Sequence, residues 1–371
     1  MPKQSKSFDG SIVVHPGAIL DKVLKDGHIS QKEVADAVGK STPVINDIIK
    51  GRRSISAEIA YLLEAIIPDM SATDWLSLQN QFDLAKIRGD EKVLKRRKSL
   101  EEWEQLKQVF NVNYLKKKLN LSGDSTEDNV TNILHYFGDA SVQALEERAT
   151  QTESYFRKST SAQVDKVNLM TWMLMVRKES SDLSSPSVMF DSKKNGELIQ
   201  QLNSIFYKNE NTIEKTCKVL KRYGIKFIDE TDRLDKTPVD GYSFWEGDHP
   251  TIAVSLRYKR LDNFAFVVMH ELGHITKHIK RNKSLDYIDI LALDSDEQKE
   301  IEANDFAVQA LAGNAPLGDL YEQWRYSPFT AKRFIVLTSE TYMIHQSIIT
   351  GQFQHHIGNY AACRDLIDNI N

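Results

Sequence analysis

The pentapeptide His-Glu-Leu-Gly-His at residues 270–274 constrains this chain more than any other feature, because its chemistry requires a helix. Histidines four residues apart share one face of a helix, and two neutral imidazoles one turn apart are a ligand pair for zinc. Glu271, beside them, is free to take a proton from water. The apolar run Phe264–Met269 predicts that the helix is buried. We therefore expect a zinc hydrolase site, with His270 and His274 as metal ligands and Glu271 as the general base.

A catalytic zinc ion usually takes three protein ligands, so a third ligand must come from another part of the chain. Glu302 is the candidate, 28 residues after His274 in a segment with helical spacing. That separation lets the chain turn and return beside the first helix, and the neighbours of Glu302 are apolar. The rivals Glu297 and Glu300 stand among charged residues, which is typical of a solvated helix face. We expect Glu302, and not its rivals, to be the third ligand.

From about residue 223 onward the chain resembles the ImmA/IrrE family of metallopeptidases. The resemblance lies in the His-Glu-x-Gly-His helix, in Glu302-Ala-Asn-Asp-Phe-Ala307 and in the late segment His345–Gln354. Thr251–Leu256 resembles the edge strand that precedes the metal helix in that family. The resemblance implies a zincin-like α+β domain, Zn²⁺ as the cofactor, and endopeptidase activity on a protein substrate such as a helix-turn-helix repressor.

Three further residues are candidates for supporting roles around the metal. His278 follows His274 by one turn and would contact a ligand rather than the metal. In the resembling family the late segment approaches the site, which makes Tyr342 and His345 candidate donors to the oxyanion of the reaction. A purely structural role is the alternative for all three.

The region before the metal helix has the pattern of a small sheet. Residues 225–229, 241–245 and 251–256 read as three strands, and one or two helices precede them between residues 196 and 223. An edge strand beside a metal cleft can bind an extended peptide by strand addition.

The N-terminal part carries a different pattern, that of three short helices. Residues 15–27 read as an amphipathic helix that ends in glycine, and residues 30–39 open with a Ser-x-x-Glu capping box. Gly39 allows a tight turn before a third helix at residues 41–51, which has Ser41 at its start and Pro43 in its first turn. Two helices joined by a short turn that contains glycine make a helix-turn-helix, whose second helix enters the DNA major groove.

Charge supports a DNA contact on this module. Between residues 40 and 53 there are four basic residues and one acid, a net charge of +3, whereas the whole chain has a net charge of −4. We expect Thr42 and Asn46 to face base edges, and Gln31 and residues 50–53 to lie nearer the phosphates. Ile45, Ile48 and Ile49 are expected in the core. The expected contact surface comprises Gln31, Ser41, Thr42, Val44, Asn46, Lys50, Arg52 and Arg53. A basic helical surface without a nucleic acid partner is the alternative.

Residues 13–86 resemble the Cro/repressor type of helix-turn-helix, in particular the HigA-like antitoxins. The resemblance continues through Trp75-Leu-Ser-Leu-Gln-Asn-Gln-Phe-Asp-Leu84. It implies double-stranded operator DNA as a partner and a homodimer on a palindromic operator.

These features predict a multidomain protein: an all-α helix-turn-helix domain at 1–86, a helical connector at 87–185, and an α+β zincin-like metallopeptidase domain at 186–371. The Ser-rich stretch at 181–187 is the expected linker. The chain has no apolar run long enough to span a membrane and no signal-peptide pattern at its start, so we expect a cytoplasmic protein without a membrane partner. Its two cysteines have neither disulfide nor metal-motif spacing.

Three functions fit these parts. The first is a DNA-binding regulator of the antitoxin or repressor type, with a zinc endopeptidase that cleaves a partner regulator, a toxin or itself. The second is a repressor or antitoxin of a toxin-antitoxin pair whose metal site only senses or stabilises. The third is a plain peptidase whose N-terminal module binds protein.

Overall fold

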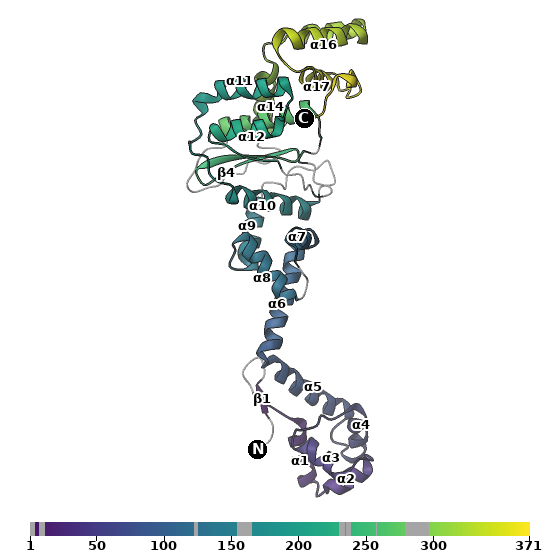
Figure 1. Cartoon of the computed structure of the whole chain (residues 1–371). Coiled ribbons are helices and arrows are strands. Elements are labelled where there is room, and N and C mark those ends of the chain that lie inside the picture. The colour runs from purple at the N-terminus through teal and green to yellow at the C-terminus, as the bar shows by residue number, and fades with distance from the viewer. Residues whose placement is uncertain are drawn as a thin grey trace. The chain divides into compact units, whose positions relative to one another are not determined.

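The computed structural model describes residues 4–6, 12–121, 125–153, 165–229, 234, 239–256, 258–278 and 297–371 (Figure 1). The chain divides into two compact units. One contains residues 1–104 with 123–130, and the other contains 105–122 with 131–371. Within the described residues, no helix is both long and apolar enough to cross a membrane. The predicted multidomain architecture, with a helical N-terminal module and an α+β C-terminal region, is confirmed. The finer division at residues 86 and 185 stays a prediction.

The N-terminal unit holds the predicted helix-turn-helix. Strands β1 (Gln4–Lys6) and β2 (Ile12–Val14) pair antiparallel ahead of the helices. The helices of this unit are α1 (Pro16–Asp26), α2 (Gln31–Ala37), α3 (Thr42–Ile49), α4 (Ala57–Ile66) and α5 (Ala72–Arg88). The next helix, α6 (Glu91–Val109), contains the boundary between the units at residue 104.

Local sequence signals explain where the helices of this module begin and end. The Ser30 amide donates to Glu33 Oε2 at 2.7 Å, and the Glu33 amide donates to Ser30 Oγ at 3.2 Å, so the predicted capping box starts α2. Gly39 takes a φ of +62° in the turn before α3, a conformation that costs glycine little. Ile45 and Ile48 are fully buried on α3, as predicted, and a wider apolar core that includes Trp75 surrounds them. Ser41 precedes α3, but its side chain makes no capping hydrogen bond.

Helices and an irregular stretch precede the sheet of the second unit. Its helices before the sheet are α7 (Val112–Lys118), α8 (Thr126–Phe137, with its first turn in the other unit), α9 (Val142–Glu153), α10 (Lys166–Asp182), α11 (Asn195–Lys208) and α12 (Thr212–Arg222). Residues 183–191, between α10 and the next helical turn, are irregular. The expected linker at 181–187 therefore overlaps this irregular stretch and the end of α10.

A three-stranded sheet separates two layers of helices in this unit (Figure 1). Its strands are β3 (Lys226–Ile228), β4 (Gly241–Glu246) and β5 (His249–Val254), in the order β3-β5-β4. Side chains alternate between the faces: Ile252 packs with α11 and α12, while Ala253 packs with α10. The strand that resembles an edge strand, at 251–256, is therefore wrongly assigned, because β5 is central and fully buried. The two edges of the sheet are β3 and β4, each of which pairs with β5 among the described strands.

Helices α13 (Leu261–Lys277) and α14 (Glu297–Ala312) form the centre of this unit, and α15 (Leu317–Tyr326), α16 (Pro328–Tyr342) and α17 (Gln346–Ile357) follow them. Helix α13 packs against α14, α17, β4 and β5, so the predicted buried helix is confirmed. Gly273 allows the close approach of α14. A Cβ at this position would lie 3.3 Å from the Cα of Ala303, tighter than most such contacts. The glycine of the pentapeptide thus sets the distance between the two helices.

Candidate metal centre

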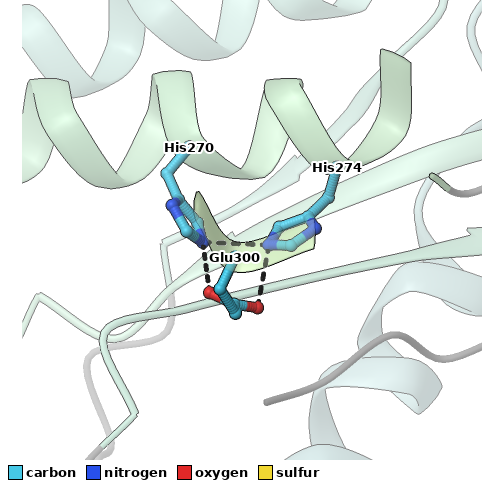
Figure 2. Close-up of side chains that lie close together, drawn as sticks. All are labelled: His270, His274 and Glu300. Atoms are coloured by element: carbon cyan, nitrogen blue, oxygen red, sulfur yellow. Dashed lines mark hydrogen bonds and ion pairs between the residues drawn. The ribbon is translucent and has the colours of Figure 1, made fainter. Parts of the chain in front are cut away.

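Three side chains from α13 and α14 meet at one point (Figure 2). The Nε2 atoms of His270 and His274 are 2.9 Å apart, and each lies 3.3 Å from a carboxylate oxygen of Glu300. His274 is almost fully buried, and His270 and Glu300 are partly exposed. Two imidazole nitrogens and one carboxylate oxygen are a donor set that zinc accepts.

The spacing of these donors fits a metal ion. Zinc binds nitrogen and oxygen at about 2.0–2.2 Å in a tetrahedral arrangement, which separates neighbouring donor atoms by about 3.3 Å. The separation of His270 Nε2 from Glu300 Oε2 and that of His274 Nε2 from Glu300 Oε1 both have this value, and the nitrogen–nitrogen separation is slightly shorter. The donor atoms are therefore close enough together for the three side chains to hold one ion.

Electrostatics keeps the carboxylate of this cluster ionised. Burial alone would raise the pKa of Glu300, but hydrogen bonding to His270 and His274 outweighs it and lowers the pKa to about 2. For His270, burial favours a lower pKa, but contact with Glu300 and the charge of Glu271 raise the pKa above its usual value. Glu300 is therefore a carboxylate over the whole physiological pH range, as an anionic ligand has to be.

Glu302, the predicted third ligand, does not join His270 and His274. Its Oε2 lies 3.2 Å from Nε2 of His278, and its Oε1 accepts a hydrogen bond from Gln298 Nε2 at 3.2 Å. Two residues along a helix turn a side chain by roughly 200°, so Glu300 and Glu302 cannot face the same point. The expectation for the third position is corrected to Glu300. The side chain of the other rival, Glu297, lies outside the described residues.

The sequence contains a signal for Glu300 in the helical spacing of α14. On a helix, Glu300 shares a stripe with Ala303, Ala307 and Leu311, at spacings of three, seven and eleven residues, and these three are buried. Ile301, one of the apolar neighbours of Glu302, is 45% exposed. Small and apolar residues that continue the stripe toward the core identify the inward face better than the nearest neighbours in sequence do.

Glu271 lies beside the cluster and is held by strand β4. Its carboxylate is buried, and Ser243 Oγ donates to its Oε2 at 2.5 Å. The backbone of Gly241 passes so close that a Cβ there would overlap Oε1 of Glu271 and a methyl group of Val267. Sequence reasoning missed Ser243 and Gly241, because no local pattern shows that β4 will lie against α13.

Of the three candidate supporting residues, one lies at the cluster. His278 Nδ1 is 3.1 Å from Nδ1 of His274. Tyr342 is 41% exposed at the end of α16, and His345 caps α17 and faces Asp368, with 3.6 Å between Nε2 and Oδ2. Neither of these two lines the cavity described next. The expectation for them is corrected, because they precede the turns of α17 that reach the cavity.

A cavity of about 600 Å³ opens beside the cluster. Apolar side chains from α13, α14 and α15 form much of its wall, and β4 contributes Gly241 and Tyr242. From the quoted late segment His345–Gln354 come Gly351 and Gln352, and beyond it lie His355, His356 and Tyr360, which sequence reasoning did not single out. The cluster and Glu271 both line this cavity, so a ligand in it would reach all four side chains.

The expected DNA-contact residues come from the start of α2, from α3 and from the residues on either side of α3. Ser41, Thr42, Lys50, Arg52 and Arg53 are exposed, whereas Gln31, Val44 and Asn46 are partly buried. Arg52 Nε donates to Asp47 Oδ1 at 2.8 Å, which offsets part of its charge. Val44 packs against the apolar core, so part of its surface is unavailable to a partner.

Both the N-terminal module and the region of the metal cluster match known protein families. Residues 20–71 match the helix-turn-helix family model, and residues 220–340 match the model of the IrrE N-terminal-like domain of peptidase family M78. A curated relative, virulence-associated protein A' of Dichelobacter nodosus, is 32% identical over 73 residues; the match covers 20% of this chain and spans 64% of the relative.

Solved structures match a similar share of the chain. The antitoxin HigA of Pseudomonas aeruginosa with the higBA promoter is 40% identical over 20% of this chain and 80% of that one, with a TM-score of 0.19. PA4674 of the same organism, in complex with an 18-bp operator DNA, is 35% identical over 22% of this chain and 87% of that one, with a TM-score of 0.20. The chain therefore joins a helix-turn-helix domain at residues 20–71 to an IrrE N-terminal-like domain of peptidase family M78 at residues 220–340.

Proposed function

We propose that this protein is a DNA-binding regulator of the antitoxin or repressor type whose C-terminal domain is a zinc-dependent endopeptidase. The observation that carries the proposal is the combination of three donor side chains with a fourth, non-donor carboxylate at one cavity. Structural zinc sites are closed by four protein ligands, whereas catalytic sites leave a position open. A cluster of three donors that lines a cavity has the second arrangement.

The residues of the site have separate roles in this proposal. His270, His274 and Glu300 would hold the ion, which when bound would supply Lewis acidity to a peptide carbonyl and to a water molecule. Glu271 accepts the proton of that water and delivers it to the nitrogen of the leaving amine. Ser243 keeps the Glu271 carboxylate in place through the 2.5 Å hydrogen bond.

The position of strand β4 favours a peptide as the substrate. Its first residues, Gly241 and Tyr242, line the cavity beside Glu271. A peptide that lies along this part of β4 would run past Glu271 as an extended strand. Extended main chain exposes the scissile carbonyl, so strand addition fits an endopeptidase better than a small-molecule hydrolase.

In this proposal the N-terminal domain directs the protein to its operator DNA. Thr42 and Asn46 on α3 would read base edges, and exposed Lys50 and Arg53 would contact phosphates of double-stranded operator DNA. A homodimer on a palindromic operator belongs to the proposal, because a single module of this size reads only one half-site. The protein substrate would be a partner repressor, a toxin or the chain itself.

Separation of the two activities tests this function. A reporter gene under the protein's own promoter would be measured with the wild type, with Glu271→Gln and with His270→Ala, beside gel-shift assays on the same DNA. We expect Glu271→Gln to bind the promoter like the wild type and to lose derepression. New chain ends, found by mass spectrometry after incubation with the neighbouring gene products, would identify the substrate.

Two outcomes would favour other functions. If Glu271→Gln behaves like the wild type in the cell while His270→Ala lowers stability, the metal site is structural or sensory and the protein is a repressor without proteolysis. If the promoter DNA is not bound at moderate salt, or if binding is insensitive to Arg53→Ala, the N-terminal module has a protein partner instead.

A further inference from the structure

His274, His278 and Glu302 form a row of polar contacts that starts at the metal cluster and ends at Glu302. His274 presents Nε2 to the cluster and Nδ1 to His278 Nδ1, at 3.1 Å. The other ring nitrogen of His278, Nε2, lies 3.2 Å from Glu302 Oε2. Gln298 Nε2 holds the second oxygen of the same carboxylate at 3.2 Å. The row therefore runs from a fixed carboxylate, through one imidazole, to a candidate ligand.

The chemistry of these groups sets the direction of the protons. An ionised carboxylate only accepts hydrogen bonds, so His278 Nε2 has to carry the hydrogen that faces Glu302. A neutral imidazole then has a lone pair on Nδ1, which can only accept from His274 Nδ1. With its hydrogen on Nδ1, His274 is left with a lone pair on Nε2, the atom that faces Glu300 and His270.

A parallel contact sets the tautomer of the other histidine. Asn304 Oδ1 lies 3.0 Å from His270 Nδ1 and accepts its hydrogen, which leaves the Nε2 lone pair of His270 facing the cluster. With the Nδ1 hydrogens held by these outer contacts, both Nε2 atoms and the Glu300 carboxylate face one point, and each Nε2 can offer its lone pair to an ion there.

We propose that Glu302 and His278 are positioning residues that hold His274 in the tautomer required for metal binding. This inference rests on the proposed zinc site, and it gives Glu302 a role different from the one that its sequence motif suggested. Glu300 and Glu302 then have different roles: Glu300 is a ligand, and Glu302 orients a ligand from a position two residues further along the same helix.

The test compares two variants of Glu302 with a matched acid. Glu302→Ala removes the acceptor, Glu302→Gln keeps a neutral acceptor, and Asp305→Ala removes one negative charge from an exposed position on the same helix. Zinc affinity of the full chain would be measured by competition with a chelating dye. In the zinc-free protein, ¹⁵N NMR of labelled histidines would report which ring nitrogen of His274 carries the hydrogen.

We expect Glu302→Ala to lower zinc affinity about 10- to 100-fold, as the loss of an outer hydrogen-bond partner typically does, and to mix the His274 tautomers. Glu302→Gln should keep the hydrogen on Nδ1 with a smaller loss, and Asp305→Ala should match the wild type. Equal zinc affinity in Glu302→Ala and Asp305→Ala would overturn the inference. If the wild type binds no zinc, the proposed function fails, and the NMR result still decides: a hydrogen on Nε2 of His274 refutes the positioning role, and one on Nδ1 supports it.

Discussion

Replacement of Ser243 by alanine tests whether β4 aims the general base. Ser243 and Glu271 are both buried, and the hydroxyl donates to the carboxylate at 2.5 Å. A hydrogen bond to a charged group contributes about 1.5–3 kcal/mol. If Glu271 needs this contact to receive the proton, the loss appears in the activation barrier, where about 1.4 kcal/mol changes the rate tenfold. We therefore expect kcat/KM for peptide cleavage to fall about 10- to 150-fold.

The assay would follow cleavage of a pooled peptide library by the zinc-loaded full chain, with zinc content measured in the same samples. Ser255→Ala is the matched control, because Ser255 is equally buried and donates to the Val239 carbonyl at 2.6 Å without contacting Glu271. We expect equal zinc content in both variants. Cleavage by Ser243→Ala at the same rate as by Ser255→Ala would show that the strand does not position the base.

Three other predictions concern parts outside the metal cluster. Arg53→Ala should weaken operator binding and lower the slope of log affinity against log salt by about one, whereas Arg52→Ala, already paired with Asp47, should lower it less; equal slopes in gel-shift titrations would contradict this. Gly17→Ala places a Cβ onto the Ile48 carbonyl, so the N-terminal module should lose about 1–3 kcal/mol or more of its stability. The variant should also lose DNA binding, with zinc binding intact. A variant that binds DNA with an unchanged Tm would refute the close contact. Burial lowers the pKa of His345 despite the nearby Asp368, so the stability that its neutral form contributes is complete above about pH 6.5 and falls as the pH drops below that value. Asparagine at this position can also cap the helix. His345→Asn should therefore show a smaller drop in Tm between about pH 8 and pH 5.5 than the wild type.

Sequence patterns identified most of the elements, because the strongest of them are local. The capping box at Ser30 and Glu33 and the glycine turn at Gly39 depend on neighbours a few residues away, and the structure forms both. The same holds for the apolar run before His270, since a continuous run of this kind is buried wherever the helix packs.

Features that depend on packing between distant segments were beyond the sequence. The order of strands in the sheet follows from which strand is paired on both sides, and the residues of β4 and β5 alone do not show this. The contact of Ser243 with Glu271 joins residues 28 positions apart through the placement of β4 on α13. The choice of Glu300 over Glu302 needed the direction of a helix face, and that direction was visible only in the stripe that continues through Ala303 and Ala307.

Zinc retention by single-residue variants tests the central claim most directly. Three purified proteins would be dialysed against a weak chelator: the wild type, Glu300→Gln and Glu302→Gln. The zinc that stays bound to each would be measured by elemental mass spectrometry. The account predicts that the wild type and Glu302→Gln retain zinc, while Glu300→Gln loses it because two imidazoles alone hold the ion weakly. Retention by Glu300→Gln together with loss by Glu302→Gln would contradict the account.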